Sequence, residues 1–242
     1  MLNKKTIVDL LELQNEHIND YPITKGDPRF SEIFEITRKL YKNKEWRELF
    51  IWFQSHVRFP LFLEIYEELN DEEYFSFLGM VLNRGSYFYD FSEELLFLLN
   101  HPKKDINKRF KLMDEKELKI YNSLPERGTI YRGAKIKTAI GHSWTLDKDK
   151  AKWFASRYNG TTVLIKGEFK KKDVIAYFGR EKEIFIDPEN IRKKKHIKIF
   201  ENILDYNPRE MMHHLVIEKI TIFPGYKKLK REMRIESRVP VL

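Results

Sequence analysis

The sequence predicts an α+β protein, in which an all-helical region over residues 1–125 precedes a mixed α/β domain over residues 126–242. In the first region, apolar residues recur with the spacing of one helix face. A turn-forming cluster, Pro125-Glu126-Arg127-Gly128, then interrupts this pattern. After the cluster, short runs rich in β-branched and aromatic residues surround one clear amphipathic helix. These three observations place the boundary near residues 123–128.

The helical region consists of successive amphipathic segments. Thr6 is placed to cap the first helix, and Asn70 or Asp71 to cap a later one. Pro60 is expected to begin a helix, because proline is tolerated in a first helical turn. The expected helices cover residues 7–18, 30–41, 46–53, 61–69, 74–82, 91–99 and 105–121.

The second region has the pattern of a mixed α/β domain. One helix is expected after Asp147, with Ala151, Phe154, Ala155 and Tyr158 on one face, and it ends before Gly160. The basic run at 193–195 is expected in a loop or at a strand edge, and a further helix is expected over 226–234. The expected strands cover residues 129–132, 161–165, 174–178, 183–186 and 214–223.

Composition excludes several kinds of site. Hydrophobic residues make up 42% of the chain and charged residues 34%, which is typical of a soluble globular protein. The absence of cysteine excludes disulfides, thiolate catalysis and Cys-ligated metals. Adjacent His213 and His214 would point to opposite sides of a strand, so we expect no metal site there. The sequence shows no membrane span and no signal-peptide core, so we expect a cytoplasmic protein without membrane contact.

Charge is unevenly distributed along the chain. Residues 1–125 hold 18 Lys/Arg against 22 Asp/Glu, a net charge of −4, whereas residues 126–242 hold 27 against 15, a net charge of +12. A basic region favours phosphate-bearing ligands, nucleic acid or an acidic partner. The alternative interpretation is a well-solvated, lysine-rich surface.

Three fragments of the second region carry the residues from which we predict function. Arg132 ends an expected strand and precedes a glycine. Ser143 and Thr145 belong to a short polar strand that leads into the expected helix. Glu181 and Glu183 stand at the start of an apolar strand. No single fragment is specific, and the prediction depends on finding the three together in this order.

Glu181 and Glu183 are expected to share one face of the sheet, because residues i and i+2 of a strand point the same way. Two carboxylates this close raise the pKa of one of them unless a cation lies nearby, and Arg132 or Arg180 is expected to supply that charge. A glycosidase built on this pair is disfavoured, because its carboxyl groups must approach the sugar from opposite sides.

In this order, the arginine, the Ser-x-Thr strand before a helix and the Glu-x-Glu before a strand resemble the mono-ADP-ribosyltransferases of the Arg-Ser-Glu class. The segment Ser143-Trp144-Thr145-Leu146-Asp147 looks like bacterial and phage-encoded, toxin-like members. The resemblance covers about 60 residues, from Tyr131 to Pro188, and departs at Trp144-Thr145, where many relatives have Thr-Ser. It implies a split β-sandwich with an NAD cleft, and NAD as co-substrate without a metal.

The resemblance also implies a role for each matching residue. Arg132 would bind the NAD phosphates or the adjoining ribose, as a planar guanidinium suits phosphate oxygens. Ser143 would fix the catalytic Glu183, and Thr145 would help to shape the nicotinamide pocket. Glu183 would stabilise positive charge on the ribose while the bond to nicotinamide breaks. Glu181 would orient or deprotonate the acceptor.

Further residues complete the expected site. Phe154 lies on the apolar helix face, which favours a core position, and the orientation of Trp144 is open. The resemblance implies that Tyr177 and Phe178 precede the Glu-x-Glu in a loop that contacts the acceptor, together with Glu181. The expected cofactor-binding residues are Arg132, Gly133, Ser143, Trp144, Thr145, Phe154 and Glu183.

The expected acceptor is a macromolecule. Glu-x-Glu resembles members that modify protein arginine, whereas the net charge of +12 and the two aromatics at 177–178 favour an RNA or DNA base. The acidic region 1–125 is expected to bind a target or a partner such as an antitoxin or chaperone, or to act as a scaffold, and a toxin–antitoxin or phage-defence role fits such control. The alternatives are a NAD glycohydrolase and a non-catalytic module that binds nucleic acid or protein.

Overall fold

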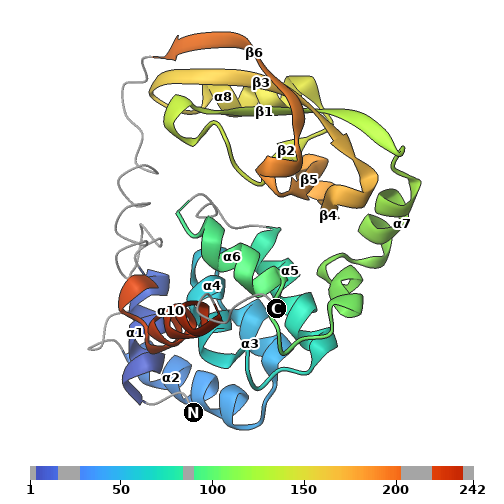
Figure 1. The fold of residues 1–242 in the computed structure, drawn as a ribbon. Helices are drawn as coiled ribbons and strands as arrows, with labels where there is room; N and C mark the ends of the chain where they lie inside the picture. The colour runs from blue at the N-terminus through green and yellow to red at the C-terminus, as the bar shows by residue number, and fades with distance from the viewer. Residues whose placement is uncertain (1–3, 16–27, 84–89, 203–219, 237–242) are drawn as a thin grey trace. The chain divides into compact units, whose positions relative to one another are not determined.

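The computed structural model describes residues 4–15, 28–83, 90–202 and 220–236 (Figure 1). The chain forms two compact units, one from Met1–Ser86 with Met211–Leu242 and the other from Tyr87–Glu210. The first unit is helical in its described residues, and the second combines helices with a six-stranded sheet. The prediction of a mixed α and β protein is confirmed. No described helix is long and apolar enough to cross a membrane.

The helical unit includes a helix from the far end of the sequence. Gly225 lies so close to helix α4 that a Cβ there would sit 2.2 Å from the Leu63 carbonyl oxygen. The Gly225 N–H donates to Glu64, and the Tyr66 hydroxyl donates to Glu232 at 2.8 Å. The helices of this unit are α1 (Lys4–Asn15), α2 (Pro28–Lys42), α3 (Trp46–Trp52), α4 (Ser55–Ile65), α5 (Asp71–Leu82) and α10 (Pro224–Glu236).

The extent of the compact units differs from the predicted division at residue 125. Packing of α10 against α4 joins the C-terminal helix to the N-terminal ones. Residues 87–125 belong to the same unit as the sheet, because the helical segments that directly precede the sheet in the sequence pack against strand β4 (Val174–Phe178). The helix expected over 226–234 is confirmed as α10. The strand expected over 214–223 lies mostly outside the described residues, and residues 220–222 are helical.

Three helix boundaries differ from the prediction. Thr6 lies inside α1 and does not cap it, because the chain is already helical from Lys4. Pro60 lies inside α4, which begins five residues earlier, because Val57 and Phe59 of its first turns are buried in the core. The single helix expected over 105–121 is divided into the 3-10 helix η1 (Ile106–Leu112) and helix α7 (Glu115–Ser123). Asp114 causes the division, since its side chain accepts the Glu117 N–H and begins a new helix with a capping box. Helix α6 (Ser92–Leu99) confirms the helix expected over 91–99.

The described strands form one sheet in the order β4-β5-β2-β1-β3-β6, and every neighbouring pair is antiparallel. Strand β6 is an edge strand and carries the basic run 193–195, as expected. Lysines at an edge oppose pairing with another chain. The remaining strands are β1 (Arg127–Lys135), β2 (Ser143–Thr145), β3 (Gly160–Lys170), β5 (Glu183–Ile186) and β6 (Arg192–Asn202).

Helix α8 (Lys148–Ser156) packs on strand β1. Asp147 caps it by accepting the N–H groups of Asp149 and Lys150. A Cβ at Gly133 would sit 1.8 Å from the Ala151 carbonyl oxygen, so only glycine allows this approach. The helix expected in this segment is therefore confirmed, and its cap fixes the polypeptide between β2 and α8.

Candidate active site

The two predicted glutamates lie in a turn between β4 and β5. Glu181 ends the 3-10 helix η4 (Gly179–Glu181), and Glu183 is the first residue of β5. Lys182, between them, has a left-handed backbone with φ of 49°. The expectation that strand alternation places both carboxylates on one face is therefore wrong, because Glu181 precedes the strand. The turn still brings their charges close enough for Glu181 to raise the pKa of Glu183.

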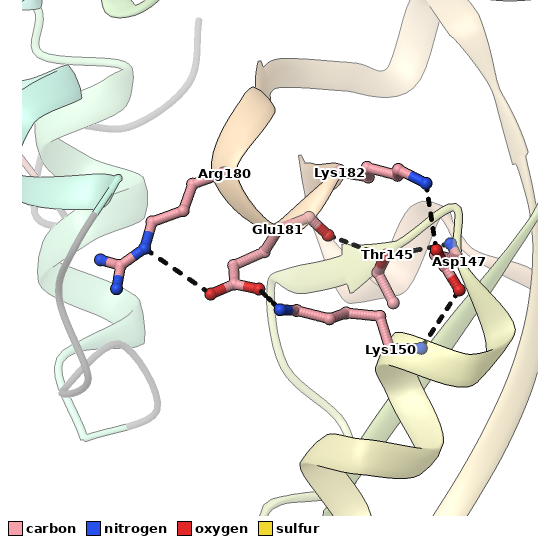
Figure 2. A network of polar contacts seen from close by, with 6 residues as sticks. All are labelled: Thr145, Asp147, Lys150, Arg180, Glu181 and Lys182. Atoms are coloured by element: carbon pink, nitrogen blue, oxygen red, sulfur yellow. Dashed lines mark hydrogen bonds and ion pairs between the residues drawn. The ribbon is translucent and has the colours of Figure 1, made fainter.

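Hydrogen bonds attach this turn to strand β2 and its connection to α8 (Figure 2). The Thr145 hydroxyl donates to the Glu181 carbonyl at 2.9 Å and accepts the Asp147 N–H at 3.1 Å. The Lys182 ammonium donates to Asp147 at 3.1 Å, and the Lys182 carbonyl accepts the N–H of Leu146 at 3.0 Å. A left-handed backbone at lysine is unfavourable, so these contacts hold the turn in a conformation it would not adopt alone.

The Glu181 carboxylate is paired with Lys150 of helix α8 (Figure 2). Their charged atoms lie 2.5 Å apart, and the Arg180 Nε lies 3.8 Å from the other Glu181 oxygen. The cation closest to Glu181 is therefore Lys150, which was not expected, whereas the expected Arg180 lies farther away and the expected Arg132 acts on Glu183. Lys150 also lies over the ring of the exposed Trp153, at 4.6 Å from its centroid.

Glu183 has the most unusual environment of the site. Its half-buried side chain lies opposite Thr145 across strands β5 and β2. Burial raises the pKa of Glu183 to about 7, while the Ser143 hydroxyl, by hydrogen bonding, and the Arg132 charge act to lower it. The charges of Glu181 and Glu117 raise it further. The structure thus brings together Glu183, Ser143, Thr145, Arg132 and Glu181, as predicted.

The Arg132 guanidinium is bonded to the chain itself. It donates to the carbonyl oxygens of Thr138, Ala139 and Ser143, at 3.0, 3.1 and 2.6 Å. Gly141 leaves room for this arrangement, since a Cβ there would lie 2.8 Å from a guanidinium nitrogen. Arg132 therefore anchors the segment before β2, and three of its five N–H groups are used in doing so.

The other expected cofactor-binding residues divide between the site and the core. Trp144 lies between Ser143 and Thr145 in strand β2, so its side chain points to the opposite face of the sheet from theirs. It is 1% exposed, and its indole N–H donates to the Gly141 carbonyl. A ligand-contacting role for Trp144 is thus not supported by its position. Gly133 is explained by the packing of α8, and Phe154 is half-buried on that helix beside Trp153.

Tyr177 and Phe178 do not lie in the acceptor loop that the resemblance implies, so that expectation is wrong, whereas the strand expected over 174–178 is confirmed as β4. They are the last two residues of strand β4 and are 4% and 1% exposed. Their β-propensity and their pairing with Ile184 and Glu183 place them in the sheet. The exposed residues of the turn that follows are Gly179, Arg180 and Lys182.

Glu117 and Lys150 are site residues that sequence reasoning missed. The buried Glu117 carboxylate accepts the Gly179 N–H at 2.9 Å, across 62 residues of sequence. The spacing of Asp114 and Glu117 is that of a capping box, which signals the start of a helix. Nothing in the sequence indicates that Glu117 also accepts the Gly179 N–H. Lys150 stands in the first turn of α8, where a lysine usually signals only an exposed surface.

The site offers a carboxylate with a raised pKa, a hydroxyl that hydrogen-bonds to it, and the positive charge of Arg132 nearby. Such an arrangement can stabilise a positive charge that develops on a bound substrate. Among the described residues no cluster of acidic and histidine side chains could hold a metal ion. Comparison of the chain with protein-family models, curated proteins and solved structures gives no match.

Proposed function

We propose that this protein is an NAD-dependent mono-ADP-ribosyltransferase that moves ADP-ribose to a macromolecular acceptor and releases nicotinamide. The observation that carries the proposal is the environment of Glu183, a half-buried carboxylate that bonds to Ser143 and lies near Arg132 and Glu181. Those are the four residues to which the sequence resemblance assigns catalysis. They come from the three neighbouring strands β1, β2 and β5 and from the turn before β5.

Glu183 supports the reaction by its charge and its fixed position. In the transfer, the bond between ribose and nicotinamide breaks, nicotinamide keeps the electron pair, and a nucleophilic atom of the acceptor bonds to the ribose carbon. The ionised Glu183 carboxylate accepts a hydrogen bond from the ribose hydroxyl beside that carbon and stabilises its growing positive charge. The Ser143 hydroxyl keeps the carboxylate in one orientation for this task.

Glu181 takes the proton that the acceptor loses. Its carboxylate lies in the turn beside Glu183, and its ion pair with Lys150 holds it against helix α8. Release of this proton to Glu181 balances the step, since the acceptor nucleophile enters protonated. Arg132 contributes its positive charge near the phosphates and holds the backbone of Ser143 in place.

Transfer of label from NAD tests the proposal and reveals the acceptor class. NAD labelled in its adenosine part is incubated with the purified protein and a cell lysate, and protein, RNA and DNA fractions are counted separately. Label is expected in one fraction with wild type and in none with Glu183→Gln. Glu181→Gln is expected to reduce labelling more than nicotinamide release. Nicotinamide release without label in any fraction would instead establish a NAD glycohydrolase.

The second candidate function is a non-catalytic module that binds nucleic acid. The three backbone contacts of Arg132 favour it, because they give that residue a structural role without a ligand. The two candidates differ in one property, since only the transferase binds NAD. Calorimetric titration of the purified chain with NAD distinguishes them.

A further inference from the structure

A groove of about 260 Å³ lies at one end of the sheet, where β1 begins, β3 ends and β6 begins. It belongs wholly to the unit Tyr87–Glu210. The start of β6 carries one extra residue relative to its partner, with Lys193 in a left-handed conformation. The groove is lined by Arg127, Gly128, Thr129, Glu168, Phe169, Lys170, Arg192 and Lys193.

Three cations of this groove form no ion pair with any carboxylate of the described residues. Arg127 lies opposite Lys170 across β1 and β3, and Arg192 lies opposite Glu168 across β6 and β3. Glu168 is already paired with Lys193 at 3.1 Å. In the part of the chain that the structure describes, no ion pair joins a carboxylate to Arg127, Lys170 or Arg192.

These cations repel one another. The pKa of Lys170 is lowered first by the charge of Arg192, then by desolvation and by the charges of Lys172 and Arg127, while the charge of Asp173 acts in the opposite direction with the smallest effect. Basic side chains on a solvated surface usually spread apart, whereas here the strand register fixes their backbones side by side. A bound anion would relieve the repulsion, so the groove has the charge of a phosphate-binding site.

Strand register relates the groove to Glu183. Arg127 and Tyr131 lie on the same face of β1. Tyr131 is paired with Thr145 of the neighbouring strand β2, and Thr145 is paired with Glu183 of β5. Arg127 is four residues along β1 from Tyr131, and Glu183 lies two strands across. With about 3.3 Å per residue and about 4.8 Å between strands, the two positions are roughly 16 Å apart. A few nucleotides of a single strand span such a distance.

We propose that this groove binds the phosphodiester backbone of a single-stranded nucleic acid and so directs a nucleotide a few positions away to Glu183. That the groove positions the acceptor rests on the proposed transferase function, whereas binding of a single-stranded nucleic acid by the groove does not depend on it. An arginine-bearing protein acceptor is disfavoured, because its positive charge would be repelled. The NAD diphosphate is attached to the ribose that must lie at Glu183, so it does not reach the groove.

The binding test uses fluorescently labelled single-stranded RNA and DNA of about 12 nucleotides and the full chain. The test variant is Lys170→Gln/Arg192→Gln. Each cation on a phosphate of a single strand contributes a slope of about 0.7 to the dependence of log affinity on log salt. Loss of two cations should therefore lower the slope by about 1.4 and the affinity by about 25-fold at 0.1 M salt.

The matched control is Lys195→Gln/Lys198→Gln, which removes the same charge from exposed positions farther along β6. It should change the affinity by less than about threefold. Equal losses in the two variants would mean diffuse attraction and would overturn the proposal, as would failure of wild type to bind either oligonucleotide. Selective loss of NAD affinity in the test variant, measured by calorimetry, would also overturn it. Oligonucleotide binding without nicotinamide release would contradict the proposed function and leave the groove established.

Discussion

The carboxylate of Glu117 in helix α7 accepts the backbone N–H of Gly179 at 2.9 Å, and so fixes the start of the turn that carries Glu181 and Glu183. The same side chain caps its own helix by accepting the Asp114 N–H. One buried residue therefore joins the helix before the sheet to the candidate active site. Its negative charge also contributes to the raised pKa of Glu183.

Glu117→Gln is expected to lower the pKa of Glu183, because it removes a nearby negative charge. Its one amide oxygen keeps an acceptor for the Gly179 N–H, while the acceptor for the Asp114 N–H is lost. Since ionised Glu183 is the active form in the proposed reaction, the acidic limb of the profile of kcat/KM against pH should move to lower pH. Glu115→Gln removes the same charge from an exposed position of the helix and should leave the limb unmoved. A limb that does not move in Glu117→Gln would contradict the coupling.

Ser143→Ala should have the opposite effect on the same profile. The Ser143 hydroxyl lowers the pKa of Glu183, so its removal should move the acidic limb to higher pH and reduce the rate at pH 7 by roughly tenfold. Ser143→Thr keeps a hydroxyl and should restore most of the rate. Steady-state nicotinamide release across pH measures both effects, and an unshifted profile in the alanine variant would exclude a positioning role.

Glu183→Gln is expected to stabilise the fold at alkaline pH. Because the folded protein raises the pKa of Glu183 from 4.5 to about 7, this group favours folding below pH 4.5 and loses that contribution as pH rises through 7. The variant should gain up to about 3 kcal/mol in free energy of unfolding at pH 8 and little at pH 4.5. Urea unfolding at both pH values measures the gain. The exposed Glu189→Gln should show none, and equal gains at both pH values would argue against burial as the cause.

Lys182→Gly should be more stable than Lys182→Ala by about 1 kcal/mol, since only glycine adopts a left-handed backbone without steric cost. Both variants lose the same contact with Asp147, so their difference isolates the backbone effect. Thermal or urea unfolding of the two proteins gives the comparison. Equal stabilities would show that the turn is not strained at this position.

Much of the fold follows from local patterns in the sequence. Helical spacing identified the segments that became α1 to α6, and short runs rich in β-branched and aromatic residues identified β1, β3, β4 and β5. Pairing between distant segments does not appear in such patterns. The packing of α10 on α4 depends on Gly225 and Tyr66, which are far apart in sequence and carry no signal of each other.

The candidate site was predicted as a set of residues but only partly as a geometry. Arg132, Ser143, Thr145 and Glu183 meet because strands β1, β2 and β5 are neighbours. The orientation of Trp144 and the burial of Tyr177 depend on which face of the sheet is covered, and the sequence does not fix that. The left-handed backbone of Lys182 changes the direction of Glu181, and no glycine or asparagine marks the position. The architecture implied by the resemblance, a split β-sandwich with an NAD cleft, stays a prediction.

The most direct test of the central claim is nicotinamide release from NAD by the purified protein, with wild type and Glu183→Gln compared at pH 8. Wild type should release nicotinamide, and the variant should do so at least about 10³-fold more slowly while still binding NAD, because it keeps the shape of the site but not its charge. Equal rates in the two proteins would remove Glu183 from catalysis. Failure of wild type to bind NAD or to release nicotinamide would contradict the enzyme assignment itself.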